Sequence, residues 1–201
     1  MHRLLIPFLL VGSLWADEKF QALGQKWSVP IAADWEEVDG IMALNVPRPQ
    51  TAPRRPKQFA LLDAGPFEKV TVEVDVRRLQ GSLIIVYAYQ DDAHFNYAHL
   101  SVDAPAKQPV HNGIFHVFGG ERVRISPLEG TGGLPDTNWH KVKLVWSGQT
   151  GEVVVTVDGQ TNGALRGIDL SLKSGKIGLG SFFDTAQFRN LKVINGAGPV
   201  A

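Results

Sequence analysis

The chain has 201 residues, of which 20 are Lys or Arg and 20 are Asp or Glu, so its formal net charge is zero. This balance provides no overall field that would attract nucleic acid or an anionic membrane, and we expect neither partner. Cysteine is absent, which excludes a disulfide framework, a thiolate nucleophile and a cysteine-based zinc site.

The first sixteen residues have the order of a secretory signal. A basic start is followed by an apolar run over residues 4–14, too short to span a bilayer, and then by the small residue Ala16. We expect cleavage after Ala16, a secreted or periplasmic location, and no membrane insertion of the mature chain; the alternative is a first strand or helix of the domain. Residues 17–201 are then expected to form a single domain, long enough to bury about 70% of its unfolded surface.

Alternating apolar and polar segments, separated by Gly, Asn, Asp and Pro, recur through the remaining chain, and no twelve-residue stretch carries a helical stripe. The predicted strands are 27–31, 37–46, 58–62, 70–79, 83–90, 95–102, 113–118, 121–126, 140–146, 153–158, 176–180 and 188–194. Turns such as Asp39-Gly40 and Asp158-Gly159 suit tight hairpins. The pattern predicts an all-β sandwich of two antiparallel sheets, with the doubly apolar run 83–88 as a central strand covered on both faces.

One loop, "PRPQTAPRRPK" over residues 47–57, combines four prolines with the cations Arg48, Arg54, Arg55 and Lys57. Two interpretations are open. The loop is either a basic lip that meets an acidic glycan or a stiff solvated connection, and connection is the more common role of proline-rich polar loops.

The segments "DTNWHKVKLVWSGQTGEVVVTVDGQ" and "GKIGLGSFFDTAQFRNLKV" carry a recognisable order of motifs over residues 139–193. A Trp-x-x-Val-x-Leu strand, a hairpin strand ending in Asp-Gly, Gly-x-Ile-Gly-Leu and a final Phe-x-Asn-Leu-x-Val strand resemble the closing half of a concanavalin A-like jelly roll, the fold of the lectin and glucanase superfamily. Residues 91–104 and 111–126 are similar to the middle of bacterial laminin G-like and 3-keto-disaccharide-hydrolase-type domains. The shared apolar and glycine positions are architectural, so the resemblance implies a fold more strongly than a function.

The stretch "VTVEVDVRR" over residues 70–78 nearly matches the Glu-x-Asp-x-x-Glu signature of the laminarinase-like hydrolases that resemble this fold. Retaining hydrolysis requires two carboxyl groups about 5 Å apart, one of them a proton donor. Arg77 or Arg78 stands where the second glutamate belongs, and arginine cannot donate that proton. We therefore expect Glu73 and Asp75 to be the polar face of a strand and to be dispensable for function.

Histidines are the next candidates for chemistry. His94 and His99 lie five residues apart, as do His111 and His116, so on a strand neither pair can chelate one ion. The faces around His99 and His116 mix aromatic and polar residues, which suits both a sugar-binding concave sheet and an ordinary core with satisfied histidines. In the resembling domains the concave sheet carries the ligand site, which implies seven candidates: Tyr87, Tyr89, Tyr97, His99, Asn112, His116 and Arg124.

Calcium is the ion that the resemblance implies, because laminin G-like and legume-lectin-like relatives often hold it with loop oxygens. Carboxylates are available at Asp91, Asp92, Asp103, Asp136 and Asp184. No run among them has the spacing of an EF-hand loop, so a calcium site stays open.

These observations favour a secreted or periplasmic carbohydrate-binding, lectin-like sandwich that lacks the standard glycosidase carboxylate pair. Two alternatives remain. One is a glycan-active hydrolase of the 3-keto-disaccharide type, or a lyase, working from the concave sheet. The other is a protein-binding structural sandwich. The carbohydrate-binding function and the glycan-active alternative both take a saccharide or glycan as partner. No catalytic residue is assigned.

Overall fold

The computed structural model describes residues 17–102, 112–130 and 132–196. The predicted signal segment 1–16 lies outside the described residues, as do His111 and Asp103. The strands are β1 (Glu18–Ala22), β2 (Gln25–Val29), β3 (Trp35–Val38), β4 (Ile41–Leu44), β5 (Gln58–Leu62), β6 (Lys69–Arg78), β7 (Ser82–Asp91), β8 (His94–Ser101), β9 (Gly113–Phe118), β10 (Arg122–Arg124), β11 (His140–Ser147), β12 (Glu152–Val157), β13 (Gln160–Ile168), β14 (Lys176–Ser181) and β15 (Ala186–Asn195), with a short 3₁₀ turn η1 (Ala32–Asp34). In this part of the chain, no helix has the length and apolar character needed to cross a membrane.

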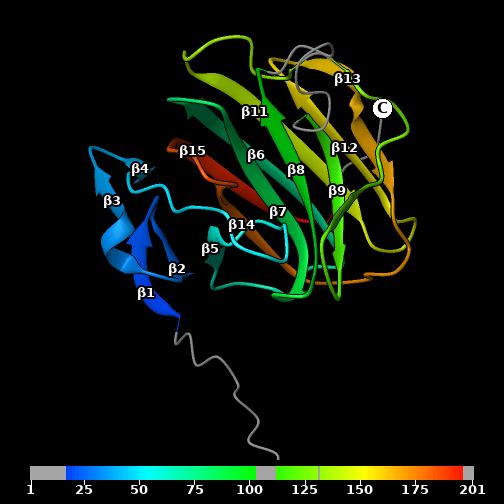
Figure 1. Cartoon of the computed structure of the whole chain (residues 1–201), viewed down its shortest axis with the longest axis horizontal. Helices are drawn as coiled ribbons and strands as arrows, with labels where there is room; N and C mark the ends of the chain where they lie inside the picture. The colour runs from blue at the N-terminus through cyan, green and yellow to red at the C-terminus, as the bar shows by residue number, and fades with distance from the viewer. Residues whose placement is uncertain (1–16, 103–111, 131, 197–201) are drawn as a thin grey trace, which may run out of the picture.

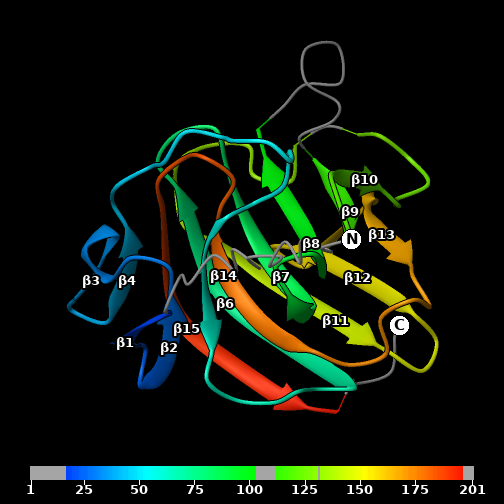
Figure 2. The ribbon, with the colours of Figure 1, turned by 60° about the horizontal axis from the view of Figure 1, so that its bottom comes forward.

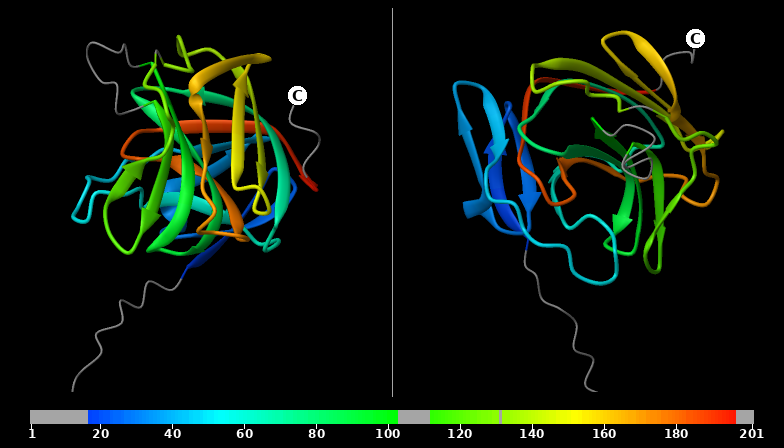
Figure 3. Two further views of the ribbon diagram at one scale, coloured as in Figure 1. Left: turned by 90° about the vertical axis from the view of Figure 1, so that its right-hand side faces the viewer. Right: turned by 45° about the horizontal axis from the view of Figure 1, so that its top comes forward.

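The strands form two antiparallel sheets that face each other as two layers (Figures 1 and 3). The eight-stranded sheet has the order β1-β2-β5-β14-β7-β8-β9-β10, and the seven-stranded sheet has the order β13-β12-β11-β6-β15-β4-β3. The three-residue strand β10 is the last strand of its sheet. This architecture confirms the predicted all-β, concanavalin A-like jelly-roll sandwich.

The main core lies between the sheets and follows from strand alternation. On β6, the valines at 70, 72, 74 and 76 point inward, while Glu73, Asp75 and Arg77 point out. The four valines belong to the same core cluster as the inward-pointing residues of β7, which include Leu83, Ile85 and Tyr87. Ile84 and Val86 of β7 belong to the apolar cluster on the other side of the sheet, so the prediction of a central strand covered on both sides is confirmed.

One predicted strand is divided in the structure, and two strands of the structure have no counterpart among the predicted ones. Predicted strand 37–46 is a hairpin of β3 and β4, because Asp39 and Gly40 both take positive φ, 52° and 73°, and reverse the chain. Strands β1 and β13 were not predicted. Their sequences, "EKFQA" and "QTNGALRGI", are polar or contain glycine and lack a long regular alternation. They form strands because they pair with β2 and β12.

The outer face of the eight-stranded sheet carries a second apolar cluster, which includes Phe59, Ile84, Phe95 and Tyr97. Residues 45–57, the connection from β4 in one sheet to β5 in the other, lie against this face (Figure 2). The amide of Gln50 donates to the carbonyl of Phe182 at 3.2 Å, and the N–H of Arg122 donates to the carbonyl of Arg54 at 3.0 Å. We call this outer face, with residues 45–57, the loop-covered face.

Candidate functional site

The loop on the loop-covered face is anchored by Arg48. Its Nε and Nη2 donate to the two carboxylate oxygens of Asp34 at 2.9 and 2.6 Å, and the Asp34 side chain is only 4% exposed. Gln58, at the start of β5, donates to the same carboxylate at 3.1 Å and accepts from the Arg48 N–H at 2.6 Å. A bidentate pair braced by an amide holds all three planar groups in fixed orientations.

Two pockets lie beside this loop. The deeper pocket has a volume of about 410 Å³, with Phe59, Leu61 and Tyr89 of the sheet and the anchoring groups Asp34, Arg48 and Gln58 among its lining residues. The shallow pocket has a volume of about 750 Å³ and is lined by loop residues together with Glu121, Phe182 and Phe183. Both volumes fall in the range of about 300–1,000 Å³ that is usual for small-molecule sites.

Tyr89 is the candidate residue that lines the deeper pocket. Its ring lies edge-on to Phe59 at 5.7 Å and 5.8 Å from the ring of Phe95. Its hydroxyl donates to Asp92 at 2.9 Å. Burial, with the nearby carboxylate of Asp92, raises the pKa of Tyr89, so the hydroxyl stays protonated. Burial and the same carboxylate also raise the pKa of Asp17, which lines the pocket as well.

Four of the seven candidate residues lie on the loop-covered face: Tyr89, Tyr97, His99 and Arg124. The expectation that all seven share one face is wrong for Tyr87, Asn112 and His116. Directly opposed residues of antiparallel strands share a face, and Tyr97 opposes Phe115 while His116 opposes Asn96. His116 and Tyr97 therefore point to opposite sides of the sheet.

A bulge separates Tyr87 from Tyr89, although the two residues are two apart on one strand. The pairing of β7 with β8 and with β14 shifts near Ala88, which takes a positive φ of 53°. The extra residue reverses the alternation. Tyr87 consequently points into the core, 5.6 Å from the ring of Trp146, while Tyr89 points outward.

The other two displaced candidates have structural partners. His116 Nδ1 lies 2.9 Å from the amide oxygen of Asn96 and 3.1 Å from the carboxylate of Asp169. Asn112 is fully buried, and its side-chain oxygen accepts the N–H of Gly133 at 2.9 Å. Both residues tie strands of the eight-stranded sheet to neighbouring loops.

His99 belongs to a buried chain of hydrogen bonds with a fixed direction. Arg122 donates to Nδ1 of His99 at 3.3 Å, so Nε2 carries the proton and donates to Ser82 Oγ at 2.7 Å. The Ser82 hydroxyl then donates to Asp184 at 3.2 Å. A serine nucleophile must donate to its histidine base, which is the opposite direction, so this trio is not arranged for nucleophilic catalysis.

Glu73 and Asp75 lie on the outer face of the seven-stranded sheet, away from both pockets. Glu73 is 3.5 Å from Lys143, and Asp75 is 3.5 Å from Arg189 and accepts from Asn190 at 2.7 Å. Each carboxylate is thus part of a charged or polar pair on a solvated surface, as the alternation predicted.

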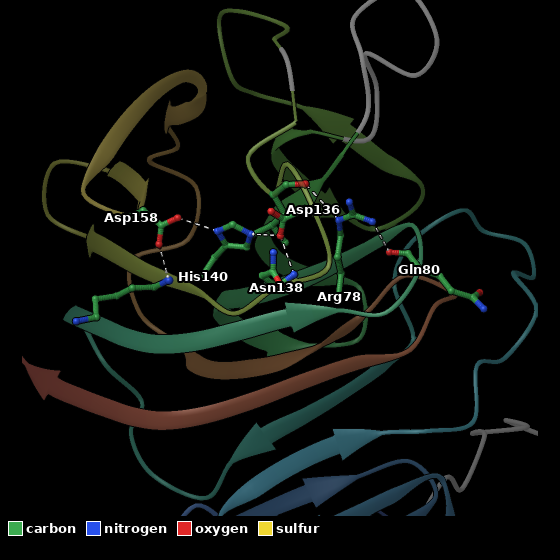
Figure 4. A network of polar contacts seen from close by, with 8 residues as sticks. Arg78, Gln80, Asp136, Asn138, His140 and Asp158 are labelled. Carbon is green, nitrogen blue, oxygen red and sulfur yellow. Dashed lines mark hydrogen bonds and ion pairs between the residues drawn. The ribbon is translucent and has the colours of Figure 1, made fainter.

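A further polar cluster joins β11 to the turn after β12 (Figure 4). The His140 ring lies between Asp158, 2.7 Å from Nδ1, and Asp136, 3.0 Å from Nε2. Burial alone would lower the pKa of His140, but its bonds to the two carboxylates outweigh burial and raise it. Each ring nitrogen faces a carboxylate, so the protonated ring donates from both nitrogens and clamps two loops together, with no nitrogen left for a substrate.

No group of three or more His, Cys, Asp or Glu side chains that could hold a metal ion occurs among residues 17–102, 112–130 and 132–196. The carboxylates considered for calcium have other contacts. Asp91 contacts His94, Asp136 contacts His140, and Asp184 accepts the N–H of Ser82.

Several residues of the loop-covered face were not identified from the sequence. Arg122 precedes Arg124 by two residues on one strand, so alternation alone could have placed both on the same face. Asp34 and Phe182 had no such signal, because their neighbours on this face come from distant parts of the chain.

No protein-family model and no curated protein matches this sequence. Solved structures match in fold. The carbohydrate-binding module CBM66 from Bacillus subtilis superposes with a TM-score of 0.54 and 16% identity, covering 88% of this chain and 91% of that chain. A putative glycosyl hydrolase from Parabacteroides distasonis gives a TM-score of 0.54 and 13% identity, covering 81% of this chain and 90% of that chain.

A mutant of the GH43 protein BlXynB from Bacillus licheniformis gives a TM-score of 0.61 and 14% identity, covering 89% of this chain but 38% of that chain. At these identities the likeness concerns architecture alone. The chain thus has the concanavalin A-like fold that its sequence predicted.

Proposed function

We propose that this protein is a noncatalytic carbohydrate-binding sandwich that takes a saccharide in the deeper pocket of the loop-covered face. The observation that carries the proposal is the composition of this pocket of about 410 Å³, whose lining combines aromatic and apolar side chains with the Arg48 guanidinium that Asp34 holds in place.

A saccharide presents two kinds of surface, a face of C–H groups and an edge of hydroxyl groups. Tyr89 and Phe59 offer aromatic surface to the first kind, at a low cost in conformational entropy. The guanidinium of Arg48, which Asp34 holds in place and which is about half exposed, offers its remaining N–H donors to the second. Preorganised polar groups of this kind lower the ordering cost of binding.

Three further points support binding rather than hydrolysis. The hydrogen bonds from His99 through Ser82 run in the wrong direction for a nucleophile, and Glu73 and Asp75 are paired on the opposite side of the molecule. The fold likeness to CBM66 is consistent with a binding role, and the signal-like residues 1–16 suggest that this role is performed outside the cytoplasm.

Binding can be tested on a polysaccharide panel by affinity electrophoresis and titration calorimetry. Tyr89→Ala is expected to weaken binding about tenfold, equivalent to about 1.4 kcal/mol, through the loss of stacking surface. Phe118→Ala is the matched control, because that ring is 58% exposed and lines neither pocket. Absence of binding to every glycan at millimolar concentration would overturn the proposal, as would equal affinities for the two variants.

A further inference from the structure

Three arginines gather on the loop-covered face beside the shallow pocket: Arg54 from the loop, and Arg122 and Arg124 from β10. Arg122 opposes Val117 and Arg124 opposes Phe115, so both point to the outer side of the sheet. The carbonyl of Arg54 accepts the N–H of Arg122 at 3.0 Å, which joins the loop to β10. The charges of all three guanidinium groups act on the hydroxyl of Tyr97 beneath them, where they oppose the rise in pKa that burial causes.

Arg54 and Arg122 have little compensating negative charge among the residues that the structure describes. Arg122 lies over the rings of Phe115 and Phe182, 4.4 and 4.8 Å from their centroids. Its hydrogen-bond partners are neutral, the Tyr97 hydroxyl at 3.4 Å and His99 at 3.3 Å. Within the described ranges, neither Arg54 nor Arg122 forms an ion pair.

Two carboxylates of the described residues, Glu129 and Glu121, lie near the cluster. Arg124 reaches Glu129 only at 4.0 Å, and the Glu129 side chain is 51% exposed. Glu121 lines the shallow pocket together with Arg54 but forms no ion pair in the described part of the chain. A further cation, Arg55, donates to the carbonyl of Gly120. The positive charge is therefore local, in a chain whose formal net charge is zero.

Clustered like charges repel one another, and partial burial strengthens the repulsion because it removes screening water. Burial and the charge of Arg122 both contribute to lowering the pKa of Arg124, although it remains protonated. A guanidinium stacked on aromatic rings keeps its N–H edge for a coplanar acceptor, and carboxylate and sulfate oxygens fit that edge well. An anionic group bound here would thus relieve repulsion as well as form hydrogen bonds.

The cluster is within reach of a ligand in the deeper pocket. Both pockets are lined by Arg48, Pro49 and Thr51, so they adjoin along the loop. Arg54 and Phe182 line the shallow pocket, and Arg122 stacks on Phe182. A saccharide longer than one residue can therefore occupy the deeper pocket and extend along the loop to the arginines.

We propose that the ligand is an anionic saccharide whose carboxylate or sulfate group is bound by Arg54 and Arg122. Arg124 donates to Ser126 Oγ at 2.7 Å and to the carbonyl of Asn112 at 2.8 Å, so it contributes its charge to the site. This inference rests on the proposed carbohydrate-binding function and adds the charge class of the sugar. It also assigns residues 47–57 a direct part in recognition.

Matched pairs of polymers test the charge requirement. Polygalacturonate is compared with its fully methyl-esterified form, and heparin with its desulfated, carboxyl-reduced form, so that each pair differs mainly in charge. At least one acidic polymer is expected to bind about tenfold or more tightly than its neutral partner, with an affinity that falls as salt rises. A difference within the polygalacturonate pair shows that a carboxylate is sufficient. The heparin pair changes carboxylates and sulfates together and extends the test to sulfated saccharides.

Variants test the assignment of the residues. Arg54→Gln and Arg122→Gln are each expected to weaken binding of the acidic polymer about three- to tenfold. Arg166→Gln, an exposed arginine on β13 of the other sheet, should leave it unchanged. Arg54 lies in an exposed loop, so Arg54→Gln remains informative even where Arg122→Gln disturbs folding.

Equal affinity for charged and neutral polymers would overturn the anionic-ligand inference and leave the carbohydrate-binding proposal standing. The same conclusion would follow if Arg54→Gln and Arg122→Gln bound the acidic polymer with the affinity of Arg166→Gln. Failure to bind any polymer, charged or neutral, would overturn both.

Discussion

At the scale of single residues, the direction of the buried hydrogen bonds decides what His99 can do. Arginine only donates, so Arg122 makes Nδ1 of His99 an acceptor and Nε2 a donor, and Ser82 must then donate to Asp184. Each member of this chain satisfies the next, and all but Arg122 are more than nine-tenths buried. The role that follows for Ser82 is structural.

Ser82→Ala tests this role. The substitution removes the hydroxyl that accepts from His99 and donates to Asp184, while the backbone N–H of residue 82 still donates to Asp184. Leaving the buried His99 N–H without this acceptor costs about 1–3 kcal/mol of unfolding free energy. Urea unfolding measures the loss, with Ser174→Ala as a control serine whose side chain has no hydrogen bond in the described structure. A Ser82→Ala protein as stable as the parent would contradict the structural role.

The His140 clamp predicts a pH dependence of stability. Its pKa is raised above 6.5 by Asp158 and Asp136, so its contribution is complete below pH 6.5 and is lost as the pH rises through the folded-state value. The pKa of Asp158 is lowered below 3.8, chiefly by its bond to His140, so that contribution is present above pH 3.8 and is lost in stronger acid. The clamp therefore stabilises most between these limits.

His140→Gln should flatten the fall in melting temperature on the alkaline side of pH 6.5. Thermal unfolding between about pH 5 and pH 9 measures this effect. A variant whose melting temperature follows the parent's pH profile would show that the clamp does not couple protonation to folding.

At the scale of elements, β6 separates a structural face from a solvated one. Glu73→Gln and Asp75→Asn are expected to change unfolding free energy by no more than about 0.5–1 kcal/mol, because their partners are partly exposed. Both variants should bind glycans as the parent does. Val74→Ala on the inward face, by contrast, should cost about 2 kcal/mol through lost burial. A loss of binding in either carboxylate variant would contradict this separation.

Alternation predicted strands well wherever it was regular. Strands β5 and β9 lie at their predicted residues, and β6 and β7 lie within a residue or so of theirs. The face of Tyr89 could not be predicted, because Ala88 takes a left-handed conformation without being Gly or Asn. Which residues of β8 and β9 share a face depends on the register in which the two strands pair, and a long connection separates them in the sequence. The sequence therefore could not show that His116 faces away from Tyr97.

At the scale of the whole molecule, the loop 45–57 creates both pockets by connecting the two sheets. It leaves β4 in the seven-stranded sheet, crosses the outer face of the other sheet, and enters β5. Its contacts with Phe182 and Gly120 join segments far apart in sequence. No local pattern encodes such contacts, which is why the pockets could not be predicted even though the basic character of the loop was evident.

Asp34→Ala tests how far the pockets depend on this anchoring. The substitution leaves Arg48 and Gln58 without their shared acceptor and should cost about 1–3 kcal/mol of stability, less than a fully buried pair because the Arg48 side chain is 48% exposed. It should also weaken glycan binding, because both pockets are lined by residues that this contact positions. Glu36→Ala, an exposed acidic residue on β3, is the control. Unchanged glycan affinity in Asp34→Ala would show that the pocket keeps its shape without the anchor.

The terminal position of β10 has a consequence for self-association. A bare strand at the end of a sheet is a template on which a second copy can add its own strand. Here that strand has three residues, two of them arginines, and the N–H of its first residue is taken by the carbonyl of Arg54. We therefore expect the charges that we assign to ligand capture also to disfavour pairing of this strand with a second copy of the chain. Neutralising both arginines of β10 is expected to lower affinity for the anionic ligand and to promote aggregation. Arg54→Gln should lower affinity only, because its backbone carbonyl still accepts the N–H of Arg122 and the charges of β10 remain.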